Sequence, residues 1–130
     1  MKDWKEQLSY NYPLMFPNHW ALPAVGIGWR PIIEAMCKDI AAIDKDSRVR
    51  VLQVKEKFGG LRFYFTIDGV KTVTDDPMWK SLNEIVAAGE DLASKTCEYC
   101  GKPGSPSSVG GWAKTLCETC AANQLKRRAR

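Results

Sequence analysis

The sequence has little of several features that mark whole classes of protein. It contains one histidine, His19, so the histidine-dependent centres of zinc nucleases and zinc deaminases are excluded. No apolar run reaches the roughly 18 residues that a membrane span needs. The opening MKDWKEQLSY carries charges where a signal peptide has its apolar stretch. With 10 glycines and 7 prolines in 130 residues, the chain is not of low complexity. We therefore expect a cytoplasmic protein without a membrane partner.

Motifs of enzymatic chemistry are also missing. The chain has no phosphate-cradling glycine loop and no nucleophile elbow, and a hairpin accounts for its Gly59-Gly60 pair. His19 and Glu56 are the remaining acid–base candidates, and His19 is more typical of a locally hydrogen-bonded loop residue. We therefore expect no enzyme and no small-molecule substrate.

The charge is unevenly distributed along the chain. The formal net charge is +4, yet residues 1–96 hold 13 basic and 13 acidic side chains. Residues 97–130 hold six basic and two acidic side chains and four of the five cysteines. This shift indicates a boundary between an α+β body at 1–95 and a basic module at 96–130, which are each small enough to need docking.

The cysteines of the module form two Cys-x2-Cys pairs separated by sixteen residues: Cys97, Cys100, Cys117 and Cys120. This spacing is typical of one structural zinc ion held by four thiolates, which leaves no open position for catalysis. Gly101 suits the positive φ of a knuckle turn. VGGWAKTL predicts a hairpin and AANQLKRRAR a final helix, an order that describes a treble-clef or ribbon-like finger. Iron or a pair of disulfides are the alternatives.

The body pattern predicts helices at DWKEQLSY, from Pro31 to about Asp44, and after Asp75 or Asp76 with Pro77 just inside. Between the first two lies an apolar loop broken by prolines. Two sets of apolar residues have helical spacing and are expected in the core: Ile33, Met36, Cys37, Ile40 and Ile43, and Met78, Trp79, Leu82, Ile85, Val86, Gly89 and Leu92. Within them, Cys37 is expected to be a buried, inert thiol.

VRVLQVKEKF and LRFYFTID predict a hairpin turning at Gly59-Gly60, with Phe58 opposite Leu61 and Leu52 opposite Ile67. In that register Glu56 is the one polar residue on the apolar face. The other face carries Val51 and a set of polar side chains: Lys55, Lys57, Arg62 and Tyr64. An ordinary solvated surface explains this face, and a nucleic-acid or partner contact with Tyr64 stacking on a base is the alternative.

Basic side chains also gather in and after the module: Lys114, Lys126, Arg127, Arg128 and Arg130. Positive charge near a helix C-terminus is favourable through the helix dipole, so a purely structural role exists. Attraction to nucleic acid or to an acidic partner is the functional interpretation.

Two stretches resemble known families. VKEKFGGLRFYF after GWRPIIEAMC, with CEYCGKPG and GGWAKTLCETCA, is similar to small uncharacterised proteins encoded by phages and prophages, over about Gly28 to Ala122. That resemblance implies an accessory protein in the cytoplasm of a bacterial host. CEYCG and TLCETC before a basic helix resemble the zinc finger of the DksA/TraR transcription factors, whose long coiled coil has no counterpart here.

We therefore expect a non-enzymatic zinc protein that binds nucleic acid or a complex that handles nucleic acid. The alternative is a protein–protein inhibitor or adaptor that acts on a host bacterial complex, such as a defence system or the transcription machinery. The aromatic loop YNYPLMFPNHW supports that alternative, because its rings could anchor an interface.

Overall fold

The structure is a computed structural model, which describes residues 3–18, 21–109 and 111–128. In these residues the chain forms two antiparallel hairpins and four α-helices, so the predicted α+β class is confirmed. The larger part contains α1 (Trp4–Asn11), the 3-10 turn η2 (Ile27–Trp29), α2 (Arg30–Ile43), β1 (Val49–Lys57), β2 (Gly60–Ile67), the 3-10 turn η3 (Val73–Asp75) and α3 (Trp79–Ala93). The C-terminal part contains β3 (Ser105–Val109), β4 (Trp112–Leu116) and α4 (Glu118–Arg128).

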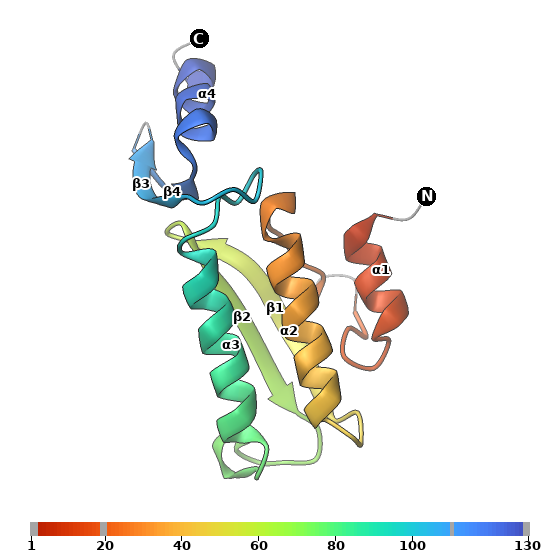
Figure 1. The fold of residues 1–130 in the computed structure, drawn as a ribbon. Helices are drawn as coiled ribbons and strands as arrows, with labels where there is room; N and C mark the ends of the chain where they lie inside the picture. The colour runs from red at the N-terminus through yellow and green to blue at the C-terminus, as the bar shows by residue number, and fades with distance from the viewer. Residues whose placement is uncertain (1–2, 19–20, 110, 129–130) are drawn as a thin grey trace.

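Helices α2 and α3 lie side by side across one face of the β1–β2 hairpin, with α1 beside α2 (Figure 1). Their apolar faces and the inward face of the hairpin enclose the main core, in which Trp29, Ile33 and Leu82 are fully buried. The proline-broken loop also enters this core through Met15 and Phe16. No described helix is long and apolar enough to cross a membrane.

The helices form where they were predicted, with differences at the start of α3 and at several expected core positions. Helix α3 begins at Trp79, two residues after Pro77, because the Asp76 carboxylate accepts the N–H of Met78 and caps a turn ahead of the helix. Leu92 was expected in the core but is exposed near the end of α3. Ile43 at the end of α2 is only half-buried, and so are three residues of the second predicted set: Met78, Trp79 and Ile85. Helical spacing therefore identified the buried faces of both helices, although not every residue on those faces is fully buried.

The predicted register of the β1–β2 hairpin is wrong. The turn is at Phe58-Gly59, so Glu56 pairs with Leu61, and Phe58 is exposed at the tip. An irregularity between Val51 and Gln53 adds one residue to β1, typical of a β-bulge. The bulge turns Val51 into the core and leaves Leu52 53% exposed, the reverse of the predicted orientation.

The outer edges of the hairpin have partners. On β1, the Val54 carbonyl accepts the N–H of Ala24 and the Val51 N–H donates to the Met15 carbonyl, both at 2.8 Å. On β2, the Phe63 N–H donates to the Glu90 carboxylate of α3 at 3.0 Å. The loop therefore pairs with the outer edge of β1 like a short third strand. The side chain of Glu90 covers the middle of the outer edge of β2.

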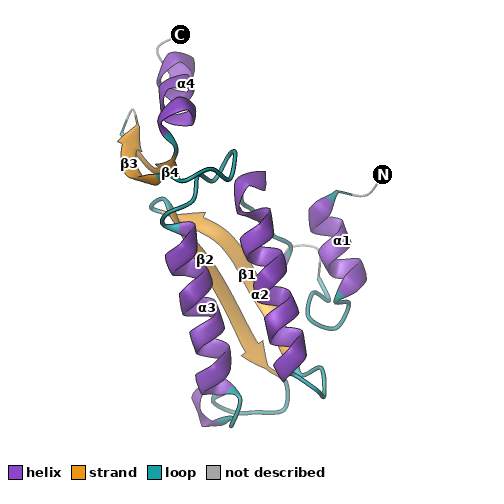
Figure 2. Cartoon of the chain, viewed as in Figure 1, coloured by secondary structure: helices purple, strands orange, loops and turns teal. Residues whose placement is uncertain are grey.

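The C-terminal part is a small finger made of a knuckle at Cys97–Cys100, the β3–β4 hairpin and α4, in the predicted order (Figure 2). Val109 pairs with Trp112, so the two strands form the predicted hairpin, and Gly110 of the predicted Gly-Gly turn lies outside the described residues. The finger stands at the end of the body where the β1–β2 turn lies (Figure 1).

Candidate metal centre

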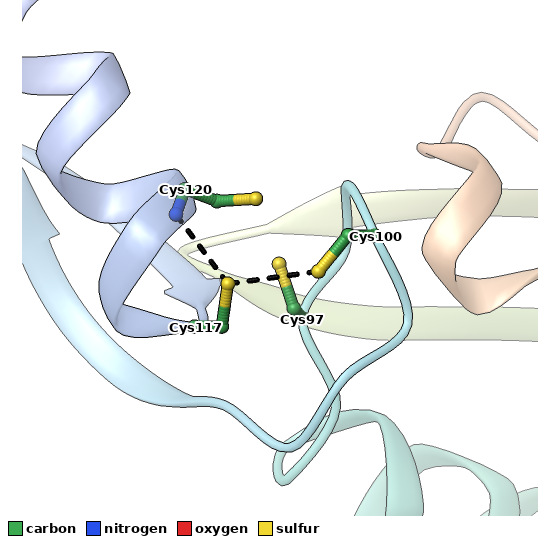
Figure 3. A group of neighbouring side chains, drawn as sticks. All are labelled: Cys97, Cys100, Cys117 and Cys120. Atoms are coloured by element: carbon green, nitrogen blue, oxygen red, sulfur yellow. Dashed lines mark hydrogen bonds between the residues drawn. The ribbon is translucent and has the colours of Figure 1, made fainter.

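The four cysteines of the finger meet at one point between the knuckle and α4. Cys97 and Cys100 come from the knuckle, Cys117 immediately precedes α4, and Cys120 lies in its first turn. The sulfur atoms all lie within 4.8 Å of one another, and those of Cys100 and Cys117 are 3.5 Å apart (Figure 3). All five cysteines of the chain are free thiols in this structure.

This geometry fits one tetrahedral metal ion. With metal–sulfur bonds of about 2.3 Å, ideal tetrahedral ligands are about 3.8 Å apart, close to the sulfur separations found here. The donor set consists of four soft thiolates, which suits zinc or iron and leaves no open coordination position. The predicted ligand set is thus brought together, and the site is suited to a structural role.

Backbone N–H groups support negative charge at the site. The amide of Cys120 donates to the Cys117 sulfur at 3.4 Å, from the first turn of α4. Burial raises the pKa of the Cys97 thiol, but hydrogen bonds from the backbone of Cys117, Cys100 and Tyr99 outweigh it and bring the pKa down to about 7. Because metal ligands bind as thiolates, these amides favour the ligand forms of Cys97 and Cys117, whereas burial raises the pKa of Cys120 to about 12.

The body holds the knuckle by direct backbone contact. Gly101 has the expected positive φ, and the Gly28 N–H donates to the Glu98 carbonyl at 2.8 Å. A Cβ at Gly28 would lie only 2.2 Å from the Cys97 carbonyl oxygen, so only glycine allows this approach. The indole Nε1 of the buried Trp29 donates to the Thr96 carbonyl at 2.8 Å. The segment before α2 therefore supports the backbone that carries Cys97 and Cys100 by direct contact.

An ion-paired group joins the finger to the β1–β2 hairpin. Lys114 of β4 contacts Glu56 of β1 at 2.7 Å and Glu98 of the knuckle at 3.3 Å. The second oxygen of Glu98 accepts the N–H of Gly26, and that of Glu56 accepts the N–H of Gly59. The side chains of Lys114 and Glu98 are 13% and 5% exposed, so they form a largely buried contact. Glu56, unexplained in the sequence, thus has a structural partner.

The pKa values of this group follow from its contacts. Burial raises the pKa of the Glu56 carboxyl, but the hydrogen bond and charge of Lys114 and the N–H of Gly59 outweigh burial and lower it overall. Burial lowers the pKa of Lys114, but the hydrogen bond that Lys114 donates to Glu56 and the charges of Glu98 and Glu56 outweigh burial and raise the pKa overall. Both groups are thus held in their charged forms.

The structure separates the predicted binding residues. Lys114, which was predicted as a nucleic-acid or partner contact, lies at the junction of body and finger, where it pairs with two carboxylates. The backbone of Lys126, Arg127 and Arg128 forms the end of α4, and their side chains lie outside the described residues. Arg130 lies outside them altogether, as does His19.

The four hairpin residues do share one face. Lys55 pairs directly with Arg62, and Gln53 pairs with Tyr64 on the same side of the sheet. Arg62, Tyr64 and Lys57 are exposed, and Lys55 is half-buried. The predicted composition of this face is therefore correct near the turn, even though the register is not.

Cys37 is fully buried in the main core, and burial followed by the charge of Glu34 raises its pKa to about 12. The predicted burial is confirmed, and a buried thiol of high pKa is a poor nucleophile and a poor ligand.

Sequence reasoning missed the residues that hold the finger on the body: Gly26, Gly28, Trp29, Glu98 and Thr115. Thr115 donates to the Gly59 carbonyl at 2.7 Å in a buried contact between residues 56 positions apart. The one signal available was the small-residue pattern GIGW before α2, which permits close backbone approach.

The comparisons with known proteins add no relative. No protein-family model matches the chain, and no curated protein and no solved structure matches it.

Proposed function

We propose that the protein is a non-enzymatic accessory protein of the phage type, stabilised by one zinc ion, which binds nucleic acid or a complex that handles nucleic acid through its finger. The observation that supports this proposal is the four-thiol cluster directly before a helix that ends in consecutive cations. Zinc is the proposed ion because a closed site of four thiolates is its usual structural environment.

The ion pairs within the protein reduce the number of charges that the finger presents to a partner. Lys114 is neutralised by Glu98 and Glu56, so it adds nothing to the outer field of the finger. What remains in residues 97–130 is one acidic residue, Glu118, against Lys102 and the cations of the C-terminal run. The surplus positive charge is thus concentrated at and after the end of α4: Lys126, Arg127, Arg128 and Arg130.

The metal contributes by placing this charge. Two of its ligands lie immediately before and within the first turn of α4, so the helix starts from a fixed point on the finger. Cations presented from a positioned helix bind phosphates with a smaller loss of conformational freedom than cations on a loose tail. Binding by phosphate contacts releases counterions, so the affinity should fall steeply with salt.

The test measures binding of labelled duplex and single-stranded oligonucleotides by fluorescence anisotropy at several salt concentrations. The triple variant Lys126→Gln, Arg127→Gln and Arg128→Gln should weaken binding and lower the slope of log K against log salt by up to about 3. A matched control removes three exposed lysines of the body: Lys38, Lys71 and Lys80. Equal effects of both variants, or no salt dependence in the parent protein, would contradict the proposal.

Metal analysis tests the other half of the proposal. Elemental analysis should find one zinc per chain, and a strong chelator should abolish binding together with the helical signal of α4, because the ligands no longer fix the helix start. Protein free of any transition metal, with its thiols oxidised in pairs, would contradict this part.

A second candidate is an inhibitor or adaptor that binds a host protein complex. The exposed Tyr10 and Leu14, at the end of α1 and in the loop after it, favour this candidate, because exposed large apolar side chains often anchor interfaces. A pull-down from nuclease-treated bacterial lysate separates the two functions. Partners kept without nucleic acid favour the adaptor, and partners lost after nuclease treatment favour nucleic-acid binding.

A further inference from the structure

The tip of the β1–β2 hairpin holds a phenylalanine at a backbone position that suits other residue types better. Phe58 has φ +54° and Gly59 has φ +84°, the pattern of a type I′ turn, whose first position prefers asparagine, aspartate or glycine. A bulky side chain is rarely found in this left-handed region. Phe58 is also 78% exposed, so burial does not compensate for the unfavourable backbone. An exposed and strained aromatic residue suggests a contact outside the chain.

On the outward face of the same hairpin, like charges lie in an unfavourable arrangement. Lys55 lies directly opposite Arg62 in the strand pairing, and like charges in opposite positions destabilise a sheet. No carboxylate pairs with Lys55, Lys57 or Arg62 in the described part of the chain. Tyr64 lies one cross-strand pair further along this face and is 44% exposed. Cations and aromatic rings therefore lie side by side on a surface that no described element covers.

Contacts with the finger hold the tip in place. The Gly59 carbonyl accepts the Thr115 hydroxyl at 2.7 Å, and the Gly59 N–H donates to Glu56 at 3.1 Å. A Cβ at Gly59 would lie 3.0 Å from the backbone nitrogen of Lys114, so the turn is packed directly on β4. The Lys57 ammonium lies 5.7 Å from the centre of the Phe58 ring. The ring is thus presented from a fixed backbone, which lowers the entropy cost of binding.

We propose that this outward face, defined by Lys55, Lys57, Phe58, Arg62 and Tyr64, binds single-stranded nucleic acid. The inference rests on the proposed function and names the polymer that the protein takes. Bases stack on the rings of Phe58 and Tyr64, and the cations contact the phosphates that join those bases. Stacking on exposed rings beside a basic surface is how proteins hold single strands without reading sequence.

The surroundings of the hairpin favour a single strand over a duplex. A two-stranded ribbon reads duplex DNA by entering the major groove, which is about 12 Å wide. Here α2 and α3 cover the inward face and the finger packs on the tip, so the ribbon is too thick to enter (Figure 1). The outward face exposes the rings of Phe58 and Tyr64 to solvent, which suits bases that are already unpaired.

The key experiment substitutes Phe58 with the residue that the turn prefers. Phe58→Asn should keep or raise the stability of the fold, because asparagine accepts this backbone conformation, and should weaken binding of labelled oligothymidine of about 12 nucleotides by about fivefold or more. Thermal unfolding and fluorescence anisotropy of the full chain measure the two effects. A merely structural role for Phe58 predicts no loss of binding in a protein that melts at the same or a higher temperature.

A second pair of variants decides the matter if Phe58→Asn does not fold. Tyr64→Ala should weaken binding of oligothymidine by a similar factor, whereas Tyr64→Phe should retain it, because the ring is kept and only the hydroxyl is lost. Lys38→Gln, an exposed lysine on α2, serves as the charge control. Equal binding by Tyr64→Ala and the parent protein would overturn the proposal.

The outcomes distinguish this inference from the proposed function. If the triple variant of α4 loses single-strand binding and the hairpin variants do not, the hairpin proposal fails and the proposed function stands. If the hairpin variants lose it and the α4 variant does not, the hairpin surface stands and the role of α4 falls. Displacement of the oligonucleotide by polyglutamate at equal charge would indicate an acidic protein as ligand and overturn the proposal. Absence of binding by the parent protein would overturn both.

Discussion

The close backbone contact between Gly28 and the knuckle predicts a large effect of Gly28→Ala. A Cβ at Gly28 would lie 2.2 Å from the Cys97 carbonyl oxygen and 2.6 Å from both the Glu98 carbonyl oxygen and the Gly101 nitrogen. All three atoms belong to the backbone of the knuckle, so no side-chain rotation relieves the clash. The knuckle must move away from the body, and the hydrogen bond from the Gly28 N–H to Glu98 is stretched or lost.

The cost follows from these contacts. Overpacking a rigid site costs about 1–3 kcal/mol, and the hydrogen bond contributes about 1 kcal/mol, for a total of about 2–4 kcal/mol. Because the displaced backbone carries Cys97 and Cys100, this cost should appear as weaker metal binding. At 1.4 kcal/mol per factor of ten, the zinc affinity should fall by up to roughly 30- to 700-fold.

Competition with a chromophoric chelator measures the zinc affinity, and urea unfolding of the zinc-loaded protein measures its stability. Gly60→Ala is the matched control, because a Cβ there meets only the Lys57 carbonyl at an ordinary 3.7 Å. We expect the control to stay within about 0.5 kcal/mol of the parent protein. If Gly28→Ala bound zinc as tightly as the control, the knuckle would not rest on Gly28 and the described docking would be refuted.

Two further predictions concern the ion pairs between body and finger. Lys114→Met should lower the free energy of unfolding by about 3–5 kcal/mol in urea, because it leaves the buried Glu98 carboxylate without its cation, and an unchanged midpoint would contradict this role. Glu56→Gln should lower the free energy of unfolding at neutral pH by about 1–3 kcal/mol, since it removes a charged hydrogen bond. The folded pKa of Glu56 lies below its ordinary value of about 4.3, so the difference between parent and variant is full above that pH and shrinks as the pH falls below it. A difference that grew on acidification would show that this sign is wrong.

The metal centre could be predicted because its signal is local. Cysteine spacing alone names the four ligands, and the hairpin and helix between and after them are short elements with strong turn and helix signals. The core faces of α2 and α3 were equally accessible, since a single helix repeats its own period. These features need no knowledge of distant residues.

The hairpin register could not be predicted correctly because the sequence is ambiguous at two places. Gly59-Gly60 looks like the turn, and only the docking of Gly59 on β4 explains why the chain turns one residue earlier at the cost of a left-handed Phe58. Val51 and Leu52 are adjacent apolar residues, so alternation cannot say which one faces the core. The N–H of Val51 donates to the loop at Met15, a contact between segments far apart in the chain.

The contacts between body and finger were out of reach for the same reason. Glu98 bonds to Gly26 across 72 positions, and Lys114 reaches Glu56 across 58. The sequence does not distinguish a lysine that pairs with a carboxylate from one that is exposed, because only the fold brings the carboxylate close to it. The sequence therefore gives no sign that Lys114 lies at the junction of body and finger.

The hydrogen bond from Phe63 to Glu90 has a consequence for how molecules of this protein meet one another. A hairpin with two free sides would offer its backbone to any neighbouring chain and grow by strand addition. Here the Ala24 and Met15 loop occupies one side, and a helix carboxylate takes the central amide of the other. That carboxylate also brings negative charge to the place where an incoming strand would present its carbonyl oxygens. The protein can thus keep its outward face open without turning the hairpin into a template for fibres.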